Sequence, residues 1–207
     1  MYFCLDLNKE FQMKNKLFTI PVLLMLLIVQ GGCAIIGYRT HFSRDLTPEQ
    51  QSKVVWGATN DELLSLTNDG RIYAINGKQM KQLVEAQPKA IVYRWSPHCT
   101  SESCLILGAM QTFCDQNGIT LFVVADYFHE SFSQIHAISN PLYIANEHYY
   151  KTSICHKLEK RFYIDLLGEE TYNATKDISW YRYIYFKSGK FVKYLEDPYA
   201  EFGDDRL

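Results

Sequence analysis

Residues 90–104, AIVYRWSPHCTSESC, decide the fold class of this chain. The run from Ala90 to Trp95 is apolar apart from Arg94, which is typical of a central strand buried on both faces of a sheet. A turn with two cysteines, Cys99 and Cys104, follows directly, and an amphipathic run comes after it. A buried strand followed by a turn and a helix predicts an α/β fold.

Strand and helix patterns alternate on both sides of this stretch. Thr47 followed by proline is typical of a helix start, and Gly118 and Gly168 are placed where helices end. The expected order is a helix after Thr47, a strand at 71–75, a helix at 77–86, the strand at 90–95, a helix ending at Gly118, a strand at 119–125, helical residues near 130–138, an extended piece at 142–145 and a helix at 152–167.

A β-hairpin closes the chain. Trp180 to Phe186 and Phe191 to Leu195 are aromatic and β-branched runs that flank a turn containing Gly189, which is a hairpin signal. The whole order predicts one domain at residues 47–207, with a mixed central sheet, helices on both faces and a C-terminal β-hairpin.

The N-terminal residues predict a targeting segment that is separate from the core. Lys14 and Lys16 precede an apolar run at 17–29, which at about 13 residues is shorter than the roughly 20 that a spanning helix needs. We expect translation to start at Met13, because the residues before it carry acidic charge where a signal peptide carries basic charge. Cys4 would then be absent from the protein.

The apolar run ends in Gly31-Gly32-Cys33, which resembles the lipobox of bacterial lipoproteins, although Gln30 departs from that pattern. The resemblance implies that residues 1–32 are removed, that Cys33 is lipidated and that residues 33–46 form a tether. A retained membrane anchor or a buried helix is the alternative interpretation. We therefore expect an envelope protein that is held on a membrane by its lipid anchor and faces the periplasm.

Composition excludes several classes of function. The formal net charge is −2, with acidic and basic residues interspersed, which argues against a nucleic-acid partner. The chain has no phosphate-binding glycine loop, no zinc-protease helix and no serine nucleophile elbow. We expect the domain to need no metal ion and no cofactor, and its oligomeric state stays open.

From Arg71 to Leu195 the chain resembles the thioredoxin-like redoxins of the bacterial envelope. The likeness rests on Ala90 to Cys99, on the helix that follows, and on the hairpin around Phe186 to Gly189. It implies a thioredoxin-like fold and exchange with thiols or disulfides of envelope proteins. Two departures are the four residues between the cysteines, where the family has two, and Tyr181 at the place of the family's cis-proline.

Local geometry decides whether Cys99 and Cys104 can pair. A continuous helix would separate them by a rise of about 7.5 Å, beyond the roughly 7 Å limit for a disulfide. Ser101 is a good N-cap, so we expect the helix to begin at Glu102, with Cys99 in the loop and Cys104 in the first turn near free amides. Cys99 would then be the attacking sulfur and Cys104 the resolving one.

Two neighbouring side chains are candidate substrate-binding residues, His98 and Tyr181. A protonated His98 could stabilise the Cys99 thiolate, and Tyr181 would present a ring and a backbone amide beside the disulfide. The remaining cysteines, Cys114 and Cys155, are expected to be small buried residues.

Three functions stay open for the cysteine pair. The first is thiol-disulfide exchange, and the second is a copper chaperone that adds one imidazole to two thiolates. The third is a non-catalytic binding module with a structural disulfide and an aromatic surface. The candidate copper ligands are His98, His129, His136 and His148, and the candidate aromatic surface residues are Tyr149, Tyr150, Tyr181 and Tyr183.

Overall fold

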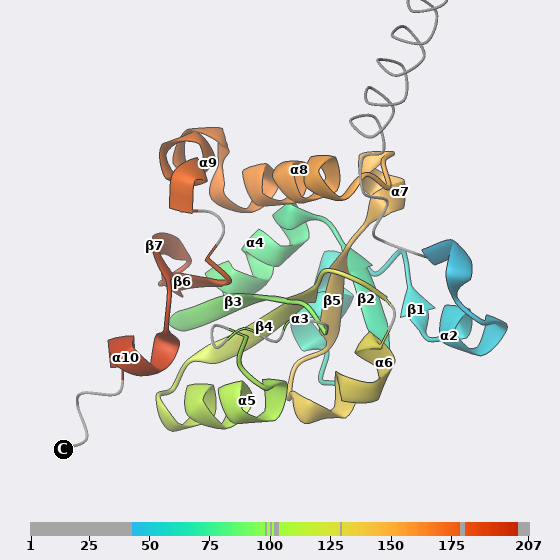
Figure 1. The fold of residues 1–207 in the computed structure, drawn as a ribbon, viewed down its shortest axis with the longest axis horizontal. Helices are drawn as coiled ribbons and strands as arrows, with labels where there is room; N and C mark the ends of the chain where they lie inside the picture. Colours follow the sequence, from blue (N-terminus) through green and yellow to red (C-terminus); the bar gives the residue numbers. More distant parts are fainter. Residues whose placement is uncertain are drawn as a thin grey trace, which may run out of the picture. The chain divides into compact units, whose positions relative to one another are not determined.

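A seven-stranded mixed sheet forms the centre of the computed structural model, which describes residues 43–97, 99, 101, 104–128, 130–178 and 181–202 (Figure 1). Its strand order is β1-β2-β5-β4-β3-β6-β7. The first five strands run parallel, and β6 and β7 are antiparallel to their neighbours. The strands are β1 (Val54–Val55), β2 (Ile72–Ile75), β3 (Lys89–Trp95), β4 (Thr120–Ala125), β5 (Leu142–Ala145), β6 (Tyr183–Lys187) and β7 (Lys190–Leu195).

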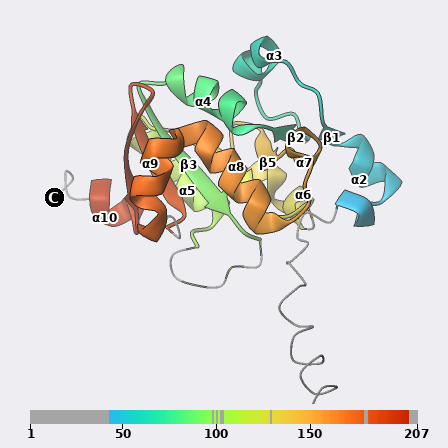
Figure 2. The ribbon, with the colours of Figure 1, turned by 90° about the horizontal axis from the view of Figure 1, so that it is seen from above.

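Helices cover both faces of this sheet. Helices α4 and α8 lie over one face of the sheet, and α5 lies over the other (Figures 1 and 2). The α-helices are α2 (Pro48–Ser52), α3 (Asn60–Ser65), α4 (Gly77–Glu85), α5 (Leu107–Gln116), α6 (Ser131–Gln134), α7 (Glu147–Tyr150), α8 (Cys155–Leu167), α9 (Glu169–Thr175) and α10 (Pro198–Phe202). The described residues also form three short 3₁₀ helices: η2 (Ser43–Asp45), η3 (Ile135–Ala137) and η4 (Lys176–Ile178).

The sheet divides the apolar interior into two cores, because successive side chains of a strand point to opposite faces. The α5-side core includes Ile72, Ile91, Tyr93, Trp95, Leu107, Met110, Phe113, Tyr183 and Tyr185. The α8-side core includes Tyr73, Met80, Leu83, Val92, Phe122, Leu158, Phe162, Tyr163 and Ile184. Strand β3 contributes to both cores, so the apolar run at 90–95 is a central strand, as the sequence predicts.

Local signals explain where the elements begin and end. Thr47 caps α2 through a hydrogen bond from the Gln50 amide, and the Gln50 side chain returns a bond to the Thr47 amide. In the hairpin, β6 and β7 meet at Ser188 and Gly189, whose φ angles are 50° and 73°. Two successive positive φ angles are typical of the tight turn that matches the twist of a hairpin.

The predicted fold class is confirmed: the chain is α/β, with a mixed sheet and a C-terminal β-hairpin. The sequence patterns missed the two-residue strand β1 and the helices α3, α7, α9 and α10. They also did not show that β5 lies between β2 and β4.

The N-terminal predictions fall on residues 1–42, so Met13, Cys33 and most of the predicted tether lie outside the described residues. Within the described ranges, no helix has the length and apolar character required to cross a membrane.

Candidate functional site

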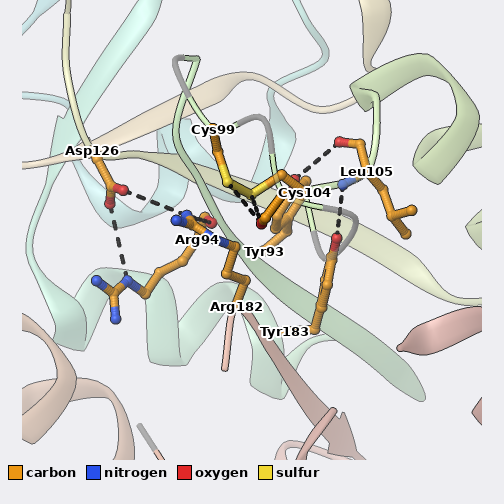
Figure 3. The surroundings of a disulfide bond; sticks show 9 residues. Tyr93, Arg94, Cys99, Cys104, Leu105, Asp126, Arg182 and Tyr183 are labelled. Atoms are coloured by element: carbon orange, nitrogen blue, oxygen red, sulfur yellow. Dashed lines mark hydrogen bonds and ion pairs between the residues drawn. A yellow bond between two sulfur atoms is a disulfide. The ribbon is translucent and has the colours of Figure 1, made fainter. Parts of the chain in front are cut away.

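Cys99 and Cys104 form a disulfide in the loop that leaves the carboxyl end of β3 (Figure 3). Their Cα atoms are 5.9 Å apart, and both residues are half-buried. The Ser101 hydroxyl lies 3.2 Å from Cys99 Sγ and donates to Cys104 Sγ at 3.5 Å. The predicted pairing is therefore confirmed, and the bridge is partly open to solvent.

The predicted start of the helix is wrong. Helix α5 begins at Leu107, with Ile106 as its N-cap residue, and not at Glu102. The Ser101 hydroxyl contacts the two sulfur atoms, and the Ser101 carbonyl accepts a bond from the Cys104 amide at 2.9 Å. The bond between Ser101 and Cys104 forms a turn within the disulfide loop. Cys104 therefore precedes the helix and does not lie in its first turn.

Two buried tyrosines connect the end of this loop to the sheet. Tyr93 of β3 and Tyr183 of β6 are register partners, and their rings stack with centroids 4.5 Å apart. The Tyr93 hydroxyl donates to the Leu105 carbonyl at 2.9 Å, and the Leu105 amide donates to the Tyr183 hydroxyl at 3.1 Å (Figure 3). We call these two residues the tyrosine pair. Both polar backbone groups of the residue after Cys104 are thus bound by side chains of the sheet.

The surroundings of the tyrosine pair are apolar, and both residues are fully buried. Burial raises the pKa of Tyr93 well above its usual value, and the neighbouring Tyr183 phenol adds to this effect. Burial likewise raises the pKa of Tyr183. Both hydroxyls therefore keep their protons at neutral pH. Aromatic residues at alternate strand positions indicated this pair in the sequence. No sequence pattern indicated its contact with Leu105.

A cluster of charged side chains lies on the opposite face of the same strand ends. Arg94 Nη2 donates to Glu159 Oε1 at 3.1 Å, and Arg94 Nε lies 4.0 Å from Asp126 Oδ1. Arg182 Nη1 lies 3.7 Å from Asp126 Oδ2, so Asp126 stands between two guanidinium groups (Figure 3). We call these four residues the Arg94 cluster. Sequence analysis found only Arg94, as a charge in an otherwise apolar strand.

Burial has the largest effect on the Asp126 carboxyl of the Arg94 cluster. It raises the pKa of Asp126 to about 6, and Glu159 also raises this pKa, whereas Arg94 and Arg182 oppose the shift. The Asp126 side chain keeps 15% of its surface exposed. Asp126 therefore changes charge at about pH 6.

A small cavity of about 20 Å³ adjoins Asp126 under the start of α8. Cys155 and Glu159 lie in its wall, and the Cys155 thiol donates to Glu159 Oε1 at 3.4 Å. Cys114 was expected to be a buried apolar residue, and this is confirmed. Its burial raises the pKa of the thiol to about 12. The same expectation is wrong for Cys155, which is half-buried and bonded to a carboxylate.

The other predicted site residues are dispersed. His98 and His129 lie outside the described residues. Tyr181 is half-buried and packs against the α8-side core, and His148 stacks on Trp56 with ring centroids 4.1 Å apart. Within the described ranges, no group of three His, Cys, Asp or Glu side chains could hold a metal ion.

The four tyrosines of the alternative aromatic surface do not gather on one surface. Tyr150 and Tyr183 are buried in opposite cores, whereas Tyr149 is 48% exposed. Buried hydroxyls need partners, and Tyr150 finds them in the Gly77 amide, which donates to it, and in Asp165, which accepts from it. Burial of two of the four rings follows from their packing against the sheet.

Neither the protein-family models, the curated proteins nor the solved structures contain a match to this chain.

Proposed function

We propose that this domain carries out thiol-disulfide exchange through Cys99 and Cys104, in a thioredoxin-like fold held at the outer side of a bacterial membrane. The observation that carries the proposal is the half-buried disulfide in the loop between β3 and α5. A partly open bridge can meet a thiol of another protein, which a fully buried structural bridge cannot do.

The chemistry is an exchange of sulfur bonds. A thiolate of the partner protein attacks Cys99 Sγ, the Cys99–Cys104 bond breaks, and its electron pair goes to Cys104 Sγ as a thiolate. A second thiolate of the partner then attacks the partner's own sulfur in the mixed disulfide and releases Cys99 as a thiolate. The partner's dithiol becomes a disulfide, and the domain's disulfide becomes a dithiol. The reverse sequence reduces a partner disulfide.

Ser101 is suited to assist this step. Its hydroxyl donates to Cys104 Sγ in the disulfide, and a hydrogen bond to sulfur strengthens when the sulfur becomes an anion. The same hydroxyl lies beside Cys99 Sγ. Ser101 therefore can stabilise either thiolate as the bond opens.

The thioredoxin-like assignment is supported by the arrangement around β3. The cysteine loop leaves β3, α5 follows it, and the hairpin of β6 and β7 packs beside β3 in antiparallel order. The proposed location is supported by the sequence alone, through the apolar run at 17–29 and Cys33.

Trapping of mixed disulfides tests the exchange. In a Cys155→Ser background, which removes the half-buried free thiol found in the described residues, the Cys104→Ser variant is incubated with envelope extract and quenched with an alkylating agent. We expect mixed disulfides through Cys99, because Cys104 is no longer present to resolve them. The matched control, Cys99→Ser in the same background, should trap few or none.

Two results would contradict the proposal. One is equal trapping by both variants. The other is trapping by neither, together with a wild-type disulfide that resists mild reductant. The bridge would then be structural, in a domain that binds partners without exchange.

A further inference from the structure

We propose that the tyrosine pair positions Cys104 and thereby sets the equilibrium between the disulfide and the dithiol. This inference deepens the proposed function, since it assigns control of the redox equilibrium to two residues outside the cysteine loop. Tyr93 and Tyr183 touch neither sulfur in the contacts described above, so they are positioning residues.

The geometry makes Leu105 a fixed point. Its carbonyl and its amide are bound to hydroxyls from two adjacent strands, at 2.9 Å and 3.1 Å. The two rings are fully buried and stacked, so neither hydroxyl can move without disturbing the α5-side core. Because Cys104 is the preceding residue, the position of its Cα follows from that of Leu105.

Cys99 is held differently. Its amide donates to the Ser96 carbonyl at 3.1 Å, and its sulfur contacts the Ser101 hydroxyl. These contacts lie within the loop itself and give Cys99 no direct connection to the sheet. The pair therefore combines one sulfur that is anchored to the sheet through its neighbour with one whose described contacts lie within the loop. This asymmetry agrees with Cys99 as the attacking sulfur and Cys104 as the resolving one.

The anchoring has a thermodynamic consequence. Closing a disulfide is favoured when the two thiols are held close together, because less freedom is lost on closure. If Leu105 is released, Cys104 gains freedom and the dithiol becomes more favourable relative to the disulfide. Loss of one hydroxyl contact should shift the equilibrium constant toward the dithiol by about threefold to tenfold.

The test measures this constant directly. Wild type, Tyr93→Phe and Tyr183→Phe are equilibrated without oxygen in buffers of reduced and oxidised dithiothreitol, and the dithiol fraction is counted by alkylation and mass spectrometry. Phenylalanine keeps the ring and removes only the hydroxyl. Tyr185→Phe is the matched control, because Tyr185 lies on the same strand and in the same core but contacts Phe202. We expect a shift in the first two variants and none in the control.

A purely structural role gives a different result. If the hydroxyls stabilise the oxidised and reduced folds equally, their loss lowers the free energy of unfolding in urea by the same amount for both forms. The equilibrium with dithiothreitol then stays at the wild-type value. That outcome overturns the inference. Either tyrosine variant that retains the native circular dichroism spectrum is sufficient for the test. The constant can be measured for a structural bridge as well, so failure of the trapping experiment and failure of this one are separate results.

Discussion

Arg94 in the central strand β3 and Glu159 in the second turn of α8 form an ion pair at 3.1 Å. The guanidinium carbon of Arg94 also lies 5.5 Å from the centre of the Tyr163 ring. The side chains of Arg94 and Glu159 keep only 20% and 31% of their surface exposed. Apart from Lys89 at its exposed start, β3 thus carries one charge, which is balanced by the helix that covers it and by Asp126.

Asp126 should make folding stability depend on pH. Its pKa is raised to about 6 from 3.8, so the folded state binds more protons than the unfolded state between these values. Stability therefore falls as the pH rises from about 4 to 6, by on the order of 1 to 3 kcal/mol. In urea unfolding across this range, wild type should lose free energy of unfolding relative to Asp126→Asn. Parallel profiles for the two proteins would contradict the assignment, and Asp61→Asn, at an exposed position, serves as the control.

Gly77 should be intolerant of a side chain. A Cβ at this position would lie 2.0 Å from the Phe162 carbonyl oxygen, so α4 and α8 approach each other at a point where only glycine fits. We expect Gly77→Ala to lower the free energy of unfolding by about 1 to 3 kcal/mol. Gly108→Ala is the matched helical control. Its Cβ would meet only the Ala137 carbonyl at 4.0 Å, so this change should raise stability by about 0.5 to 1 kcal/mol. Thermal unfolding compares the two, and equal effects would refute the close contact.

Gly189 is required by the hairpin turn. Its φ of 73° suits glycine, and a Cβ there would lie 2.9 Å from the Glu85 Cα. Gly189→Ala should therefore cost about 1 to 2 kcal/mol in urea unfolding. Gly57→Ala is the comparison and should change stability little, because a Cβ there would have no atom of the described residues within 4 Å. A neutral Gly189→Ala variant would show that the turn can rearrange.

Lipidation of Cys33 is expected from the residues that precede it. Labelling of cells with a fatty acid should mark the wild-type protein and not the Cys33→Ser variant. Cys155→Ser is a control that should keep the label, because Cys155 lies in the folded domain. Labelling that persists in Cys33→Ser would rule out this anchor.

Periodicity predicted the buried elements well and the site poorly. The strand at 90–95 and the hairpin carry repeating apolar patterns over several residues, and these patterns depend only on which face is buried. The start of α5 depends on long-range contacts. The tyrosine pair binds both backbone groups of Leu105. The hydrogen bonds of α5 therefore begin at Ile106, whose carbonyl accepts from the Met110 amide. These contacts have a stronger influence on where the helix begins than the preference of Ser101 for the N-cap position.

The Arg94 cluster was missed for a related reason. Arg94 is separated by many residues from Glu159 and Arg182, and no local pattern connects them. Only the pairing of β3 with β6 and the position of α8 bring the three together. The cysteine pairing, in contrast, is local, because only four residues separate Cys99 from Cys104. The sequence therefore indicated the pairing, although the helix start assumed for it was wrong.

The central place of β5 has a consequence for the order in which the domain can assemble during synthesis. Ile72 of β2 pairs with Leu142 of β5, 70 positions later. Until that segment leaves the ribosome, β2 has only the two-residue strand β1 beside it, and its other edge has no strand to pair with. An open strand edge attracts other chains. A nascent chain that ends before β5 should therefore be the stage that most needs a chaperone.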